Sequence, residues 1–202
     1  MNNKDVIKAI DHHELLLEKV IAKEVSTSYF DSNKLELFDS QINKLELKKR
    51  VLGSAVIIRT KISNSIFTNT DMGGMLFYEN QFFNNSFHSC YFRKSEFKDS
   101  VFKNTVFLNC NLSKCEFINC QFVNCQFTNC DFGWSFIHES ILDGGELKDN
   151  KFDALIISDT KVIATLLSGN IFNLKYPLKY SKDSNIILCT NQSDFNKSLQ
   201  IK

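Results

Sequence analysis

The chain has 202 residues, and its 24 Lys and Arg nearly balance its 23 Asp and Glu. This balance leaves no strong field toward DNA or anionic lipid, so no direct nucleic-acid binding is expected. No run approaches the roughly 18 consecutive apolar residues of a membrane span, and the charged start MNNKDVIKAIDHHELLLEKV lacks a signal peptide's apolar core, so we expect one domain, no membrane association and a cytoplasmic location.

The first predicted element is a helix over residues 3–25. Asn3 is a suitable N-cap and Asp5 falls in the first turn. Helical spacing places one apolar face on Val6, Ile10, Leu17 and Ile21. His12 and His13 are adjacent, so on a helix they point in divergent directions.

A period of five residues then dominates the chain. In FINCQFVNCQFTNCDF, residues 117–132, Phe and Cys each recur at every fifth position. Every position from 37 to 172 in steps of five is apolar, in a chain that is 43% apolar overall, so coincidence does not explain the pattern. A helix repeats every 3.6 residues and a strand every two, so neither element explains it.

A second register lies two residues before each of these apolar positions. From residue 90 onward it holds small residues: Cys90, Ser95, Ser100, Thr105, Cys110, Cys115, Cys120, Cys125, Cys130, Ser135, Ser140 and Gly145. We therefore expect one large apolar and one small residue of every five to point inward. Leu45, Arg50 and Met75 depart from this rule, and Arg50 needs a partner or an outward turn.

The run SVFKN TVFLN CNLSK CEFIN CQFVN CQFTN resembles, unit by unit, the motif of the pentapeptide-repeat family, over roughly residues 37–172. The resemblance implies an all-β fold, a right-handed quadrilateral parallel β-helix with one unit per side and about seven coils. At the parallel strand spacing of about 4.8 Å the rod would be about 30–35 Å long. Asn64, Asn84, Asn104 and Asn124 would stack at one corner as an amide ladder.

The ends of such a solenoid need caps, because open coils expose backbone and core. Residues 1–36 are expected to form a helical segment packed on the solenoid, and residues 173–202 a capping or dimerisation extension. In some members of the family this extension forms a dimer interface, which makes a homodimer an alternative use. After Pro177, NIILC (185–189) predicts a short strand and SDFNKSLQIK one or two helical turns.

The cysteines are expected to be core residues rather than metal ligands. Zinc sites pair cysteines two to four residues apart on a tight turn, whereas these fall on successive sides of the coil. His88 and His138 are two and a half coils apart, on opposite sides. No Ser–His–Asp constellation, phosphate loop or metal-binding spacing is found, so we expect neither a cofactor nor an enzyme.

One side of the solenoid is predicted to be apolar on its outer surface. Its exposed positions include Phe38, Val56, Ile58, Leu76 and Tyr78, and a patch of this kind is normally covered or used. The favoured interpretation is that the N-terminal helix folds over it, and the alternative is a dimer or partner interface. The C-terminal tail would similarly cover Phe136 and Ile156.

Charge varies along the rod. Residues 44–61 are basic, and residues 131–159 form a candidate acidic surface that consists of Asp131, Glu139, Asp143, Glu146, Asp149, Asp153 and Asp159. A solvated surface explains the same residues equally well.

Two kinds of function follow from the resemblance. Some family members protect type II topoisomerases such as DNA gyrase from antibiotics by mimicking DNA, which implies antibiotic resistance or immunity as the role. This chain departs from them because it is nearly neutral and lacks their inserted loops. The alternative is a general protein-interaction scaffold or secreted effector that docks through the apolar side.

Overall fold

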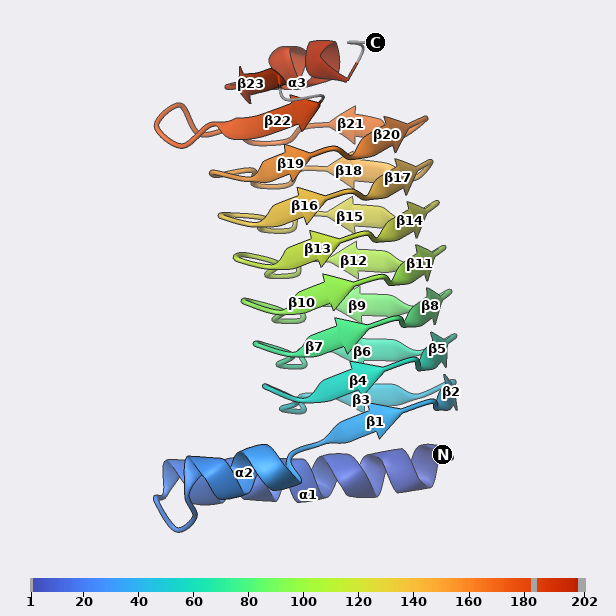
Figure 1. Cartoon of the computed structure of the whole chain (residues 1–202). Helices are drawn as coiled ribbons and strands as arrows, with labels where there is room; N and C mark the ends of the chain where they lie inside the picture. Colours follow the sequence, from blue (N-terminus) through green and yellow to red (C-terminus); the bar gives the residue numbers. More distant parts are fainter. Residues whose placement is uncertain (1, 183–184, 200–202) are drawn as a thin grey trace.

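The chain forms a rod of stacked coils with a helical cap at each end (Figure 1). The computed structural model describes residues 2–182 and 185–199. It is a parallel β-solenoid of about seven turns, which confirms the predicted fold. Helices α1 (Asn3–Ile21) and α2 (Thr27–Asn33) lie below the first coil in Figure 1, and α3 (Gln192–Ser198) lies above the last.

Three parallel sheets form three sides of the rod. Sheet A faces the viewer in Figure 1 and begins with seven three-residue strands: β1 Glu36–Phe38, β4 Val56–Ile58, β7 Leu76–Tyr78, β10 Glu96–Lys98, β13 Glu116–Ile118, β16 Phe136–His138 and β19 Ile156–Ser158. Sheet B consists of β2 Gln41–Asn43, β5 Lys61–Ser63, β8 Gln81–Phe83, β11 Val101–Lys103, β14 Gln121–Val123, β17 Ile141–Asp143 and β20 Lys161–Ile163. Sheet C consists of β3 Glu46–Lys48, β6 Ile66–Thr68, β9 Ser86–His88, β12 Val106–Leu108, β15 Gln126–Thr128, β18 Glu146–Lys148 and β21 Leu166–Ser168.

The fourth side has isolated bridges in place of three-residue strands, and each coil contributes a single bridging residue to it: Val51, Asp71, Tyr91, Asn111, Asp131, Lys151 and Ile171. On every side a residue pairs with the one 20 positions later, as Phe97 does with Phe117 and Phe102 with Phe122. Residues 20 apart therefore form straight columns along the rod, and an exposed column is a line of side chains about 4.8 Å apart.

The corners between sides require left-handed backbone. The residue two positions after the central apolar residue has a positive φ in unit after unit, for example 51° at Asn64 and 54° at Asn84. Asn and Asp tolerate this conformation better than other residues with a side chain. The Asn104 amide donates to Asn84 and the Asn84 amide to Asn64, both at 3.1 Å, which is the predicted ladder at these three positions.

The core of the middle coils is a set of stacked phenylalanine rings. Along one column Phe77, Phe97 and Phe117 lie almost parallel, with centroids 4.5 and 4.9 Å apart. Between neighbouring sides the rings meet edge to face, as Phe97 and Phe102 do at 5.6 Å and 65°. Both geometries are favourable for aromatic pairs.

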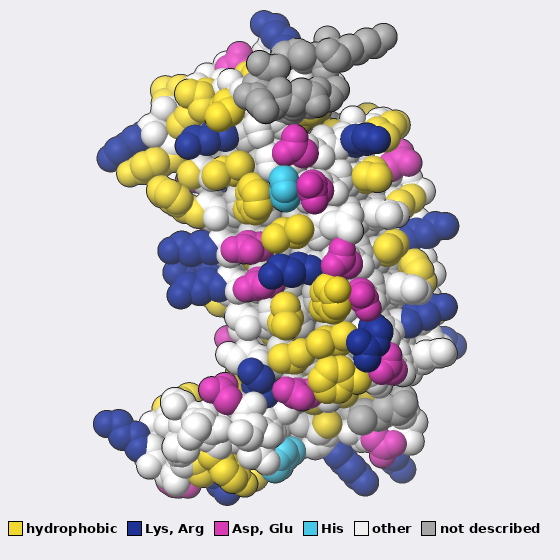
Figure 2. All heavy atoms as spheres, in the orientation of Figure 1, with side chains coloured by type: hydrophobic (Ala, Val, Ile, Leu, Met, Phe, Trp, Pro, Cys, Tyr) yellow, Lys and Arg dark blue, Asp and Glu magenta, His cyan; other side chains and the backbone are white. Residues whose placement is uncertain are grey.

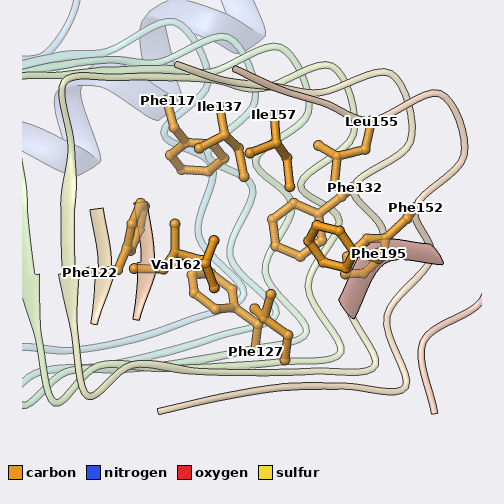
Figure 3. Close-up of a pocket in the computed structure, with 12 residues that line it drawn as sticks. Phe117, Phe122, Phe127, Phe132, Ile137, Phe152, Leu155, Ile157, Val162 and Phe195 are labelled. Atoms are coloured by element: carbon orange, nitrogen blue, oxygen red, sulfur yellow. The ribbon is translucent and has the colours of Figure 1, made fainter. Parts of the chain in front are cut away.

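Toward the C-terminal end aliphatic side chains replace the rings. Ile137 and Ile157 continue the Phe117 column, and the smaller side chains leave an apolar cavity of about 20 Å³ (Figure 3). Phe195, from α3, lies beside this space with its ring centroid 6.1 Å from that of Phe152. The C-terminal helix therefore closes the core by inserting an aromatic side chain.

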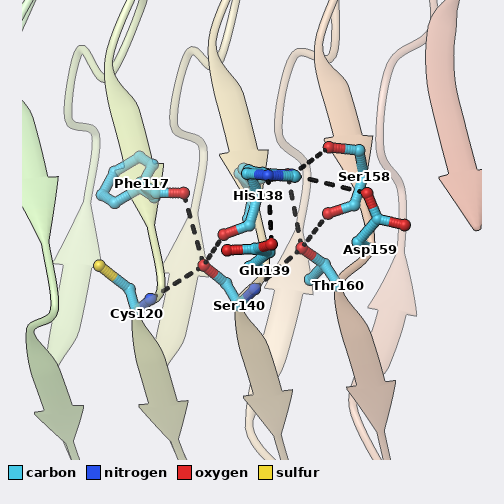
Figure 4. Close-up of polar contacts among 9 residues, drawn as sticks. Phe117, Cys120, His138, Glu139, Ser140, Ser158, Asp159 and Thr160 are labelled. Atoms are coloured by element: carbon cyan, nitrogen blue, oxygen red, sulfur yellow. Dashed lines mark hydrogen bonds and ion pairs between the residues drawn. The ribbon is translucent and has the colours of Figure 1, made fainter.

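The small inward residues tie each coil to the one before it. Cys120 donates its thiol to the carbonyl of Phe97. The hydroxyl of Ser140 lies between the carbonyl of Phe117 in the preceding coil, at 3.4 Å, and that of His138, at 2.8 Å (Figure 4). The backbone N–H of Cys120 in turn donates to the hydroxyl of Ser140 at 3.0 Å. No buried side-chain N or O of the described residues lacks a partner.

Burial raises the pKa of Cys115 and Cys120 to about 12, so both remain thiols at neutral pH. The predicted core role of these cysteines is confirmed.

The N-terminal helix differs in detail from the prediction. Its N-cap is Asn2, whose side chain accepts from the N–H of Asp5, rather than Asn3, and it ends at Ile21, before α2 begins. The buried face consists of Val6, Ile10, His13 and Leu16, whereas Ile21 is 80% exposed. Val6 and Ile10 join the buried core cluster of the first coil, so the helix plugs the open end.

Arg50 has the partner that its inward position requires. Its guanidinium donates to both carboxylate oxygens of Glu14 on α1, at 2.7 to 3.0 Å, and it also forms an ion pair with Asp11. The N–H of Val51 donates to the same Glu14 carboxylate. Arg50, which departs from the small inward register, therefore binds the N-terminal helix to the first coil.

His13 is a second fastening point between the cap and the solenoid. It is fully buried. Its Nδ1 accepts from the N–H of Leu35 at 3.0 Å, so its Nε2 carries the proton and donates to the carbonyl of Gly53 at 3.1 Å. Burial lowers the pKa of His13 below 6.5, because removal from water disfavours the charged imidazolium.

The C-terminal extension continues sheet A. Strand β22 (Leu178–Lys182) pairs in parallel with β19, and β23 (Asn185–Cys189) pairs antiparallel with β22. The strand predicted at NIILC and the helical turns predicted in SDFNKSLQIK are confirmed as β23 and α3, apart from residues 200–202, which lie outside the described part. No helix among the described residues is long and apolar enough to cross a membrane.

Truncating one ring of the stack should destabilise the rod. Phe107 is fully buried and stacks on Phe87 and Phe127. We expect Phe107→Ala to lower the free energy of unfolding by about 3–5 kcal/mol, measured by urea unfolding. Lys103→Ala, an exposed change in the same coil, should shift it by less than about 0.5 kcal/mol. A loss below about 1 kcal/mol for Phe107→Ala would contradict the stacked core.

The stability of the cap should depend on pH through His13. The pKa of His13 is lower in the folded state than the ordinary 6.5, so the unfolded chain binds more protons and stability rises with pH in this range. We expect the free energy of unfolding to fall as the pH drops from about 7.5 toward 5.5. His13→Gln should remove this dependence, and His12→Gln, a change at an exposed position, should keep it. An unchanged slope in His13→Gln would disprove the assignment.

Candidate interaction surfaces

Among the described residues, the cavities found inside the rod are small and apolar. The two cavities at the ends of the core measure about 20 and 30 Å³ and are lined by apolar side chains alone. Among the described residues no group of three or more His, Cys, Asp or Glu is arranged to hold a metal ion. The candidate functional features are therefore on the outer surface, in the columns of exposed side chains.

The structure does bring one Ser, His and Asp together, which sequence analysis missed. Nδ1 of His138 lies 2.7 Å from Oγ of Ser158 and 3.7 Å from a carboxylate oxygen of Asp159 (Figure 4). Residues 138 and 158 are 20 apart, so a search by columns would have found the pair.

This cluster does not have the geometry of a catalytic triad. In a triad the serine and the acid contact opposite ring nitrogens, whereas Ser158 and Asp159 both face Nδ1. At Nε2 the nearest carboxylate oxygen, from Glu139, is 3.7 Å away, which is beyond hydrogen-bond distance. Ser158 is also 92% buried. The His138 ring, stacked on Phe136 at 5.3 Å, thus orients surface side chains rather than activating a nucleophile.

The predicted apolar side forms a continuous patch on three consecutive strands of sheet A, here called the sheet-A patch: Phe38, Val56, Ile58, Leu76 and Tyr78. Phe38, Ile58 and Tyr78 are register partners, as are Val56 and Leu76. Phe38 is 46% exposed and the other four are half-buried. Yellow side chains gather on the lower part of the face shown in Figure 2, over these strands.

The favoured interpretation, in which the N-terminal helix covers this patch, is wrong. Helix α1 lies across the end of the rod instead, because the first coil exposes a complete layer of core side chains that only an end cap can bury. The C-terminal tail likewise leaves Ile156 36% exposed, since β22 pairs with the open edge of β19 rather than lying on the face. The homodimer predicted for the extension stays a prediction.

The acidic residues of 131–159 do not form one surface. Glu139 and Asp159 follow strands of sheet A, Asp143 lies on sheet B, Glu146 and Asp149 belong to sheet C and the corner after it, and Asp131 and Asp153 lie on the fourth side. A segment of 29 residues winds more than once around a 20-residue coil, so its charges are distributed over all four sides.

A different set of acids does line up along the rod. The corner that follows sheet A carries Asp39, Glu79, Asp99, Glu139 and Asp159, here called the acidic column. Arg59, in the same column, pairs with Asp39 at 2.6 Å, and Asn119 donates to Asp99. The only sequence signal for this column is the step of 20 residues, which becomes visible once the coil length is known.

Comparison with known proteins agrees with this geometry. Residues 80–157 match the family model of the pentapeptide repeat region, and no curated protein matches the chain. A solved structure of trypsin-treated QnrB1, a plasmid-mediated fluoroquinolone resistance protein, is similar with a TM-score of 0.54 and 17% identity, over 69% of this chain and 73% of that one.

Two other pentapeptide repeat proteins also align. HetL from Nostoc sp. strain PCC 7120, involved in heterocyst differentiation regulation, has a TM-score of 0.32 and 11% identity over 67% of this chain and 82% of that one. Rfr23 from Cyanothece 51142 has a TM-score of 0.29 and 9% identity over 73% of this chain and 88% of that one. Residues 80–157 thus form a pentapeptide repeat region, and the solenoid that contains them has a fold similar to that of the trypsin-treated QnrB1 structure.

Proposed function

We propose that this protein is a non-enzymatic binding protein that docks a protein partner on the sheet-A patch. The observation that carries the proposal is the patch itself: five apolar side chains in register on a face that no described segment covers. Soluble proteins rarely leave a contiguous apolar patch exposed unless it is used. The proposal places the protein in the cytoplasm.

The surroundings of the patch have the composition of a protein interface. Its centre is apolar and includes Phe38 and Tyr78, and aromatic residues are enriched where interfaces concentrate their binding energy. Charged residues surround it, with Asp39 and Arg59 paired along one margin and Glu96 and Lys98 paired at 2.7 Å above it. An apolar centre within a polar rim is the usual anatomy of an interface.

Charge substitutions on two opposite sides of the same coils test this proposal. We expect Ile58→Glu with Tyr78→Glu to weaken partner binding at least tenfold without loss of the fold, because both side chains lie on the outer surface. Thr68→Glu with His88→Glu makes the matched change on sheet C. The measurement compares, by quantitative mass spectrometry, the proteins that immobilised wild type and each variant retain from a lysate of the source cells.

The expected result is a protein retained by wild type and by the sheet-C variant but lost with the sheet-A variant. Equal retention by all three would contradict docking on the patch. Urea unfolding of the same variants checks the fold, and strong destabilisation of the sheet-A variant alone would show that these side chains support the solenoid instead.

Binding to a type II topoisomerase is the second candidate function. Two observations favour it: the solenoid resembles the fold of QnrB1, a fluoroquinolone resistance protein, and the acidic column runs along one corner of the rod. The magnitude of the charge limits the mimicry. B-DNA carries one negative charge per about 1.7 Å of axis, whereas the column offers at most one carboxylate per coil, or per about 4.8 Å. The acidic column could therefore imitate only one line of phosphates.

A gyrase assay tests this second function. We expect the protein to inhibit supercoiling, or to relieve ciprofloxacin-stabilised cleavage, at micromolar concentrations. Reversing three charges of the acidic column, Asp99→Lys, Glu139→Lys and Asp159→Lys, should abolish the effect. Asp143→Lys, Glu146→Lys and Asp149→Lys change the charge equally on other sides and should retain it. No effect of wild type at tens of micromolar would exclude this function, and equal loss in both variants would exclude the column as its site.

A further inference from the structure

We infer that the corner between the fourth side and sheet A is a second docking site, which takes an acidic segment of a partner protein. The residues at this corner in three consecutive coils are Lys94, Lys114 and Trp134, and Arg93 lies beside Lys94. Backbone hydrogen bonds join these coils here, from Lys94 to Ser113 at 3.1 Å and from Lys114 to Gly133 at 2.9 Å. The three side chains therefore start about 4.8 Å apart along the rod.

The backbone at this corner does not require an aromatic residue at position 134. Its φ of 63° lies in the left-handed region, which a bulky side chain rarely adopts. The same column carries Ser54, Lys94, Lys114 and Ala154 at positive φ, so the fold does not require an aromatic residue there. Trp134 is 59% exposed, and its ring contacts that of the partly exposed Tyr176, at 5.3 Å and 51°. Unfavourable backbone and a largely exposed ring are typical of a residue kept for binding.

The cations below this aromatic pair are not neutralised within the protein. None of Arg93, Lys94 and Lys114 forms an ion pair with a described residue. The carboxylate of Glu96 is paired with Lys98, and Asp131 accepts from the N–H of Gly133. Dark blue side chains gather at the left margin of Figure 2 at the level of the middle coils, below a group of apolar ones. Unpaired cations beside exposed rings complement a carboxylate-rich segment with an apolar anchor.

A protein segment fits this corner better than a nucleic acid does. Nucleic-acid affinity grows with the number of neutralised phosphates, and this corner offers three cations within about two coils. A longer polyanion would next meet Glu116 and Asp153, and the chain as a whole carries a net charge of +1. A short acidic segment can end before those carboxylates and still place one apolar side chain against Trp134 and Tyr176.

Trp134 is the single tryptophan of the chain, so its intrinsic fluorescence reports on this corner alone. The probe is a synthetic dodecapeptide of glutamates with a central Phe–Leu pair, and a dodecamer of thymidylate serves as the nucleic-acid comparison. We expect the peptide to shift the Trp134 emission saturably at micromolar to submillimolar concentrations, and a rise from 50 to 500 mM NaCl to weaken binding at least fivefold. Lys94→Glu with Lys114→Glu should weaken binding at least tenfold, whereas Lys103→Glu with Lys61→Glu, on sheet B, should change it less than twofold.

A second variant tests the aromatic contribution. Trp134→Asn keeps a residue that tolerates the left-handed backbone and removes the ring, so binding is then followed by anisotropy of fluorescein-labelled peptide. We expect at least tenfold weaker binding with unchanged unfolding. Absence of saturable binding to wild type at 1 mM, equal binding by the two charge variants, or tighter binding of the thymidylate would overturn the proposal. Ile58→Glu with Tyr78→Glu should leave peptide binding intact, so this result is independent of the sheet-A patch.

Discussion

The structure depends on the stacking of each coil onto the one before it, through two inward side chains in every five residues. The large one packs against its equivalents 20 residues away, ring on ring in the middle coils. The small one donates to a carbonyl of the preceding coil, which leaves the narrow core without an unsatisfied polar group among the described residues. Ser, Thr, Cys and Asn all serve because each carries a donor and fits the space. Arg50, which is too large and carries a charge, lies in the first coil and pairs with Glu14 of the cap.

The same stacking determines how the ends are built. A coil at either end has lost one neighbour, so its core layer and its backbone edge both need cover. At the N-terminal end α1 supplies apolar side chains for the core, while Glu14 and His13 satisfy groups of the first coils. At the C-terminal end two different elements provide this cover: β22 pairs with the backbone edge of β19, and Phe195 of α3 fills the core layer. Neither cap is then available to cover an outer face.

The candidate interaction sites are consequently columns of exposed side chains. Each column is a row of outward positions whose side chains lie outside the packed core. The sheet-A patch, the acidic column and the corner with Trp134 are three such rows, and they differ in chemistry although they share one scaffold. The His138 cluster shows that side chains 20 residues apart in the sequence come within hydrogen-bond distance on the outer surface.

The sequence by itself determined the repeat, the inward registers and therefore the solenoid. The period of five residues is a local pattern, and each five-residue unit shows it without reference to the others. It also predicted that Arg50 needs a partner or an outward turn and that the cysteines are buried. What only the tertiary structure decided is where the non-repeating segments lie and which residues meet on the surface. Helix α1 has an apolar face that would fit either the end of the rod or its side, and only the burial of the first coil's core layer selects the end. Acids that are neighbours along the chain separate onto four sides, whereas Asp99, Glu139 and Asp159 come into line, because proximity on the surface follows the 20-residue coil rather than the order of the chain.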